Sequence, residues 1–152
     1  SASLIYNTTP TSTVFGVGTG TWVNGSGTEY IAYCWSEVAG YSKIGKYEGT
    51  ANADTSLGAF IYCGFKPAWI LVKNADAAED WFIWDNERDG YNPTYQYFKA
   101  NDTAAENANT NDGIIDVTST GFKIRSQYSP NNANTYVFAA FAESPFKYAN
   151  AR

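Results

Sequence analysis

Two apolar, aromatic-rich segments separated by a short acidic gap dominate the middle of the chain. The first reads GFKPAWILVKN over residues 64–74, and the second reads DWFIWDNERDGYN over residues 80–92. Pro67 suits the start of a strand, where its missing N–H interrupts no ladder hydrogen bond. The unbroken apolar run after it predicts a strand covered on both faces. Together the segments predict two antiparallel strands, residues 69–73 and 81–85, followed by a polar loop.

The rest of the chain continues this β pattern. Aromatic residues make up 17% of the sequence and charged residues only 16%, which is typical of an all-β protein with polar loops. Further strands are predicted at residues 13–17, 29–35, 43–48, 59–65, 94–98, 114–118, 122–126 and 135–143, a weaker terminal strand or arm at 145–152, and one short helical turn at 102–108. We therefore expect residues 1–152 to form a single antiparallel β-sandwich of the jelly-roll or lectin-like kind, with at most one short helix.

The two ends of the chain echo each other. Residues 13–37 and 120–143 each read as a short strand, a polar loop and an aromatic-rich strand that closes on Glu. Two hairpins of one sandwich with the same turn chemistry would explain this, and so would residues 1–37 as the last strands of an upstream repeat. The chain contains no Met, so we expect a fragment or a processed product of a longer protein.

Composition excludes several classes of function. The chain has no His, which removes Ser-His-Asp and Cys-His catalysis and the commonest zinc ligand. A net charge of -5 argues against nucleic acid, and no apolar run approaches the roughly 20 residues that span a bilayer. We expect no enzymatic activity, no nucleic-acid partner and no membrane insertion. Cys34 and Cys63 lie in apolar strand-like runs, which predicts two buried thiols and leaves a disulfide open.

The loop after the second aromatic strand holds the candidate ligand-binding residues. It combines flat aromatic rings with Asp, Asn and Arg side chains, as saccharide sites do, and protein interfaces share that composition. Core packing is the competing role for most of the aromatic residues, because either Phe82 and Trp84 or Trp81 and Ile83 must face inward. The candidate residues are Asp85, Asn86, Arg88, Asp89, Tyr91, Asn92 and Tyr95.

Carboxylates in this region suggest two further chemistries. Asp85 to Gly90 follows the first half of an EF-hand loop, but Gln96 stands where the bidentate Glu is needed, so an EF-hand is excluded. We expect no cofactor, with a looser Ca²⁺ site at a sandwich edge as the alternative to Asp85 and Asp89 accepting backbone N–H bonds. A second group of carboxylates suggests a glycosidase pair, although a solvated hairpin tip explains it better. These residues are Asp76, Glu79 and Asp80.

Five sequence blocks carry a resemblance to a known class of proteins. They are residues 27–49 (GTEYIAYCWSEVAGYSKIGKYEG), 64–74, 80–92, 119–125 (STGFKIR) and 134–147 (NTYVFAAFAESPFK). In this order they resemble a domain of unknown function found near the C-terminus of bacteriophage virion proteins, mostly tail-fibre and structural proteins of phages of aquatic bacteria. The resemblance implies an all-β, lectin-like module at the virion surface and assigns no ligand residue.

These observations lead to an expected function with alternatives. We expect a non-enzymatic tail-fibre or spike module, an adhesin that recognises a host-surface glycan or protein. The alternatives are a structural or decoration module that binds other virion proteins and, less favoured, a glycan-degrading enzyme. Because open sheet edges need cover, we also expect a homo-oligomer, a trimer as in fibres, located on the tail fibre or the capsid exterior.

Overall fold

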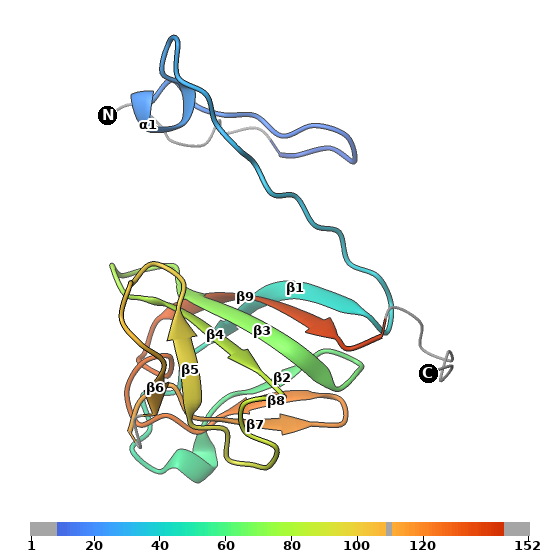
Figure 1. The fold of residues 1–152 in the computed structure, drawn as a ribbon, viewed down its shortest axis with the longest axis vertical. Coiled ribbons are helices and arrows are strands. Elements are labelled where there is room, and N and C mark those ends of the chain that lie inside the picture. Colours follow the sequence, from blue (N-terminus) through green and yellow to red (C-terminus); the bar gives the residue numbers. More distant parts are fainter. Residues whose placement is uncertain (1–8, 109–110, 145–152) are drawn as a thin grey trace. The chain divides into compact units, whose positions relative to one another are not determined.

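The chain divides into two compact units, Ser1–Trp35 and Ser36–Arg152. The computed structural model describes residues 9–108 and 111–144 (Figure 1). The predicted arm at residues 145–152 therefore lies outside the described residues.

The second unit is a sandwich of two antiparallel sheets, which confirms the predicted fold class (Figure 1). Along the larger sheet the order is β1 (Ser42–Glu48), β9 (Thr135–Ala142), β3 (Pro67–Asn74), β4 (Trp81–Asp85), β5 (Gln96–Lys99) and the two-residue β6 (Asn107–Ala108). The smaller sheet is β2 (Phe60–Tyr62), β8 (Gly121–Ile124) and β7 (Ile115–Thr118). Within the described residues, every predicted strand except those at residues 13–17 and 29–35 overlaps a strand of these two sheets.

The core lies between the two sheets and follows the two-residue alternation of the strands. On β3, Ile70 and Val72 are buried and face the smaller sheet. On β4, Phe82 and Trp84 face the core, whereas the sequence alone also allowed Trp81 and Ile83. Phe122 of β8 closes the core from the other side. Full burial of one such side chain contributes about 1.5–3 kcal/mol.

The opposite side of the larger sheet, here called the outer face, is also apolar but only partly covered. Leu71 pairs with Ala139 on one side and with Ile83 on the other, so these three side chains form a row across the sheet. The expectation that the strand over residues 69–72 is covered on both faces is therefore wrong for the outer face. The outer face consists of Ile44, Trp69, Leu71, Trp81, Ile83, Phe98, Val137, Ala139 and Phe141.

Three local predictions are wrong. Residues 13–17 carry only a bridge at Val17, and residues 29–35 are extended with no ladder partner among the described residues, because strand propensity alone supplies no neighbour. Residues 102–108 are not helical: the Asp102 carboxylate accepts the Ala104 N–H, and β6 then pairs with β5. The short helices are instead α1 (Thr21–Asn24) and the 3₁₀ turn η1 (Thr55–Leu57).

The two cysteines differ in their surroundings. Both are free thiols, but only Cys63 is buried, and burial raises its pKa to about 11. Cys34 is exposed, so the prediction of two buried thiols is wrong for Cys34. Residues 29–35 around Cys34 are not assigned to a strand in the described part of the chain.

Candidate functional site

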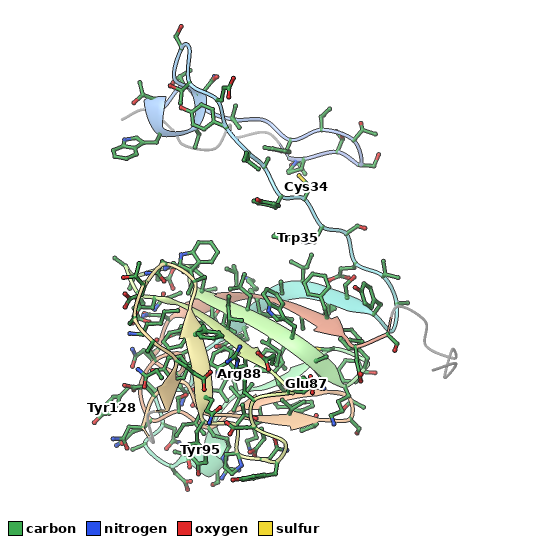
Figure 2. The ribbon with its side chains drawn as sticks, viewed as in Figure 1. Cys34, Trp35, Glu87, Arg88, Tyr95 and Tyr128 are labelled. Carbon is green, nitrogen blue, oxygen red and sulfur yellow. The ribbon has the colours of Figure 1, made fainter. Side chains whose placement is uncertain are left out.

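An open cleft of about 390 Å³ lies between the β3–β4 turn, β5 and the β8–β9 loop. It combines an exposed tyrosine with two buried aromatic rings, three carboxylates, a lysine and an amide. Its lining residues are Ala78, Glu79, Asp80, Phe82, Tyr97, Lys99, Asp112, Tyr128, Ser129 and Asn132. Figure 2 shows Tyr128 at the margin of the sandwich, pointing outward and away from Arg88 and Glu87.

The β8–β9 loop that supplies three of these residues is anchored from beneath. Asn131 is fully buried, and its Oδ1 accepts hydrogen bonds from the N–H and the hydroxyl of Thr50, each at 3.1 Å. Its Nδ2 donates to the carbonyl of Ser126 at 3.0 Å. The Tyr47 hydroxyl donates to the carbonyl of Pro130 at 2.8 Å. These bonds hold the loop on the core while Tyr128 stays 54% exposed.

Glu79 lies in the β3–β4 turn and reaches the β8–β9 loop. Its carboxylate accepts hydrogen bonds from Ser129 Oγ at 2.5 Å and from Asn132 Nδ2 at 3.1 Å. Burial alone would raise the pKa of Glu79, but hydrogen bonds, first of all that from Ser129, hold this pKa below its ordinary value. Glu79 is therefore an anionic wall of the cleft, and the expected solvated hairpin tip is wrong for this residue.

Asp80 and Lys99 form an ion pair at the same rim. Lys99 Nζ lies 2.7 Å from Asp80 Oδ2, and Asn101 donates to the other carboxylate oxygen at 3.0 Å. The hydrogen bond from Lys99 lowers the pKa of Asp80, and the same bond raises the pKa of Lys99. Both side chains thus remain charged over the ordinary pH range and offer a hydroxyl group an acceptor beside a donor.

Asp112 enters the cleft from a turn that is fixed to the core. The indole N–H of Trp84 donates to the carbonyl of Gly113 at 2.7 Å. Gly113 has φ +64°, and a Cβ there would lie 2.3 Å from the Tyr97 ring, so only glycine fits. Asp112 Oδ1 is buried, and burial raises the pKa of this carboxyl group above its ordinary value.

The cleft therefore holds two carboxylates with opposite pKa shifts, Glu79 below and Asp112 above the ordinary range. Hydroxyl-rich ligands suit such a lining, because carboxylates accept hydroxyl protons while the ammonium and amide groups donate. Opposite shifts in neighbouring carboxylates are also the pattern of acid and base pairs in glycosidases. The lining thus offers hydrogen-bond acceptors and donors side by side.

The charged side chains of the predicted loop after β4 bond to groups of the loop itself and to its neighbours. The Asp85 carboxylate accepts the backbone N–H groups of Glu87 and Arg88, both at 3.1 Å, and contacts Arg88 Nε at 2.6 Å. Arg88 also pairs with Glu106, and its guanidinium lies 3.8 Å above the Phe98 ring. Figure 2 shows Arg88 beside Glu87 on this part of the sandwich. Asp85 and Arg88 thus stabilise the turn and one end of the outer face.

The other predicted site residues either hold the loop together or are exposed to solvent. Asp89 Oδ2 accepts the N–H groups of Tyr95 and Gln96 at 2.7 and 2.8 Å. Asn92 bonds both the N–H and the carbonyl of Val117, at 2.8 and 2.7 Å. Tyr91 is 76% exposed. The structure brings four of the candidates together in a small pocket of about 80 Å³, and these are Asn86, Asp89, Tyr91 and Asn92.

Sequence reasoning missed most of the larger cleft. It singled out Glu79 and Asp80 but placed them on a solvated turn, and it did not propose Tyr128, Ser129 or Asn132 as site residues. Hydrogen bonds to Glu79 from residues 50 and 53 positions away bring these groups together. In the described residues, no group of three or more His, Cys, Asp or Glu side chains is placed to hold a metal ion. No helix in the described ranges is long and apolar enough to cross a membrane.

One protein family accounts for nearly the whole chain. The model of a domain of unknown function, DUF7483, matches residues 1–145. The chain belongs to the DUF7483 family. Neither the curated proteins nor the solved structures include a match to this chain. The DUF7483 match spans both compact units, so the N-terminal unit and the sandwich occur within one family domain.

Proposed function

We propose that this DUF7483 protein is a non-enzymatic receptor-binding module of a phage virion that recognises a host-surface saccharide through the cleft beside Tyr128. One observation carries the proposal: an exposed tyrosine stands at an anchored cleft whose wall alternates carboxylate, ammonium and amide groups. Sugar rings present flat C–H faces, and an exposed aromatic ring supplies the matching surface. The sequence blocks that resemble phage virion domains support the virion location, on a tail fibre or on the capsid exterior.

The cleft fits this role better than the loop after β4. In that loop the charged groups of Asp85, Arg88 and Asp89 are engaged by its own backbone and neighbours. In the cleft, the Glu79 carboxylate interacts with the side chains of Ser129, Asn132 and Asn74, and a carboxylate has about four acceptor positions, so it keeps capacity for a ligand. Weak binding at one such site is strengthened when a homotrimer presents several copies.

Two exposed tyrosines provide a matched test. Tyr128→Ala should weaken binding to isolated host-surface polysaccharide by about tenfold or more, whereas Tyr91→Ala should leave it unchanged. Tyr62, 67% exposed on the smaller sheet, gives a third variant that should bind normally. Titration calorimetry or a glycan array measures the binding, and thermal melts check each fold. Loss with Tyr91→Ala and normal binding by Tyr128→Ala would move the site to the loop.

Glycan degradation is the alternative that the two carboxylates favour. Glu79 and Asp112 have pKa shifts in opposite directions, as acid and base would need. Incubation with host polysaccharide and a reducing-end assay separates the two functions. We expect no new reducing ends from the wild type; their appearance, and their loss in Glu79→Gln, would replace the adhesin by a hydrolase.

A structural module that binds other virion proteins is the second alternative, and the exposed apolar surfaces favour it. Ile31 and Tyr33 are 82% and 75% exposed, and the outer face of the larger sheet is only partly covered. An isolated protein that binds neither host cells nor polysaccharide, but binds purified tail or capsid parts, would establish this role instead.

A further inference from the structure

The cleft beside Tyr128 carries more negative than positive side chains. Three of its lining residues end in carboxyl groups and one ends in an ammonium group, and these are Glu79, Asp80, Asp112 and Lys99. The other lining side chains are uncharged. Because a cleft lined by an excess of one charge focuses the field of that charge, the sign of the excess selects among ligands.

Asp80 and Glu79 differ in how their negative charges are balanced. Asp80 has a cation of its own, because Lys99 Nζ lies 2.7 Å from Asp80 Oδ2. Glu79 instead receives its hydrogen bonds from neutral hydroxyl and amide groups, those of Ser129, Asn132 and Asn74. In the described part of the chain, no lysine or arginine forms an ion pair with Glu79. The charge of Glu79 is therefore held in place without a partner cation.

Charged groups just outside the lining do not reverse the excess. Lys73 acts on Glu79 from outside the cleft lining. Its ammonium group donates to two backbone carbonyls at 2.8 and 3.2 Å, those of Asn74 and Ala77. Asp102, also outside the lining, acts on Lys99 with the opposite sign of charge. The surroundings thus add one positive and one negative group, and the cleft stays negative.

Asp112 increases the negative potential when it is ionised. Burial is the main cause that raises the pKa of Asp112, Lys99 acts to lower this pKa, and the charge of Glu79 acts to raise it further. The two carboxyl groups of Glu79 and Asp112 therefore repel each other when both are charged. A cation of the ligand beside them would relieve this repulsion, whereas an anion would add to it.

Tyr128 supplies a surface that also favours a cation. Its side chain lines the cleft and is 54% exposed. Ammonium groups bind over the face of a tyrosine ring, within about 6 Å of the ring centroid, and the attraction grows where water is excluded. The cleft thus combines a fixed carboxylate that has no partner cation with an accessible aromatic ring, and this combination suits an ammonium group.

We propose that the ligand of this cleft is an amino sugar with a free amino group, whose ammonium form binds at Glu79 beside the ring of Tyr128. Hydroxyl groups of the same sugar bond to the pair of Asp80 and Lys99, which offers an acceptor next to a donor. Neutral sugars bind more weakly, and acidic sugars are rejected because they bring an anion to a negative lining. This inference rests on the proposed saccharide function and names the class of saccharide.

Titration calorimetry of the full chain with three oligosaccharides of equal length tests the proposal. The probes are oligomers of glucosamine, of N-acetylglucosamine and of galacturonic acid, at about pH 6, where amines are protonated. The glucosamine oligomer should bind about tenfold or more tightly than its N-acetylated counterpart, in which the amine is masked. The galacturonic acid oligomer should not bind. Added salt should weaken only the glucosamine complex, because salt screens the attraction between opposite charges.

Two variants with the same change in charge locate the amine. Glu79→Gln and Glu87→Gln each remove one negative charge from a chain of net charge -5, but only Glu79 lines the cleft. Glu79→Gln should weaken binding of the glucosamine oligomer about tenfold and change binding of the N-acetylated oligomer by less than about twofold. Glu87 is exposed on the loop after β4, and Glu87→Gln should leave both affinities unchanged. Thermal melts check the fold of each variant.

Binding of the N-acetylated oligomer as tight as that of the glucosamine oligomer would overturn the proposal, and so would a preference for the acidic oligomer. Choline tests whether any ammonium group suffices: if it binds as tightly as the glucosamine oligomer, the cleft is a general ammonium site and the amino sugar is wrong. The proposed function fails separately. Host polysaccharide that binds through Tyr128, with no preference for the free amine among the oligomers, would leave the adhesin function without this inference. If neither the host polysaccharide nor any oligomer binds, both are wrong.

Discussion

The loop after β4 and the cleft beside Tyr128 contain the same kinds of residues and use them differently. In the loop, the carboxylates of Asp85 and Asp89 accept backbone N–H groups, so their removal should unfold the turn. In the cleft, Glu79 bonds side chains of a separately anchored loop and lines open space. Residue composition therefore identifies candidates, whereas the hydrogen-bond partners decide whether a polar group supports the fold or remains available to a ligand.

The largest effect is expected where the cleft depends on the core. Asn131→Ala removes three hydrogen bonds and leaves the Thr50 N–H and the Ser126 carbonyl without this partner. The variant should lose about 3 kcal/mol of unfolding free energy, measured in urea, and also lose saccharide binding. Asn131→Asp keeps the acceptor for Thr50 and should lose less. An unchanged Asn131→Ala midpoint would show that the loop needs no such anchor.

Asp89→Ala should have the next largest effect and should separate stability from binding. Its carboxylate accepts two backbone N–H groups, and bonds to a charged acceptor are each worth about 1.5–3 kcal/mol. We expect a loss of about 2 kcal/mol in the unfolding free energy and unchanged saccharide binding below the melting temperature. Glu87→Ala, an exposed neighbour, should change stability by less than about 0.5 kcal/mol. If a folded Asp89→Ala variant fails to bind, the loop rather than the cleft is the site.

Glu79→Gln should show a pH dependence of one sign. The pKa of Glu79 is lowered in the folded state, so its charge adds stability above the unfolded value of 4.5, and this stability is lost as the pH falls through the folded pKa. Glu79→Gln should therefore be less stable than the wild type near neutral pH, by no more than about 1 kcal/mol after solvent screening. The difference should vanish in acid. Thermal melts at several pH values test this, and an equal loss at every pH would assign the effect to packing.

Much of the sandwich could be predicted from the sequence because alternation and Pro67 act locally. The strands over residues 69–73 and 81–85 were predicted within two residues of β3 and β4. The cleft was not predictable in the same way, because Glu79 and Asn132 meet only through a loop that the buried Asn131 fixes. The strand predicted over residues 29–35 failed for a related reason: propensity describes a residue's preference and says nothing of its neighbour in space. The groups that line the cleft come together through long-range contacts, which local sequence patterns do not encode.

Asp112→Asn should give the smallest effect, and it should have the opposite sign. Burial raises the pKa of Asp112, so the charged form costs stability, and that cost grows as the pH rises through the interval between the ordinary value of 3.8 and the folded pKa. The isosteric amide should therefore stabilise the protein near neutral pH by less than about 1 kcal/mol, with no gain in acid. Melting curves of both proteins across this pH range measure the gain. If Asp112→Asn also binds saccharide more weakly, the ligand uses the Asp112 carboxylate. The wild type then keeps this group for binding at a cost in stability, as binding sites often do. A stabilised variant with full affinity would instead assign Asp112 no part in recognition and leave the binding to Tyr128 and Glu79.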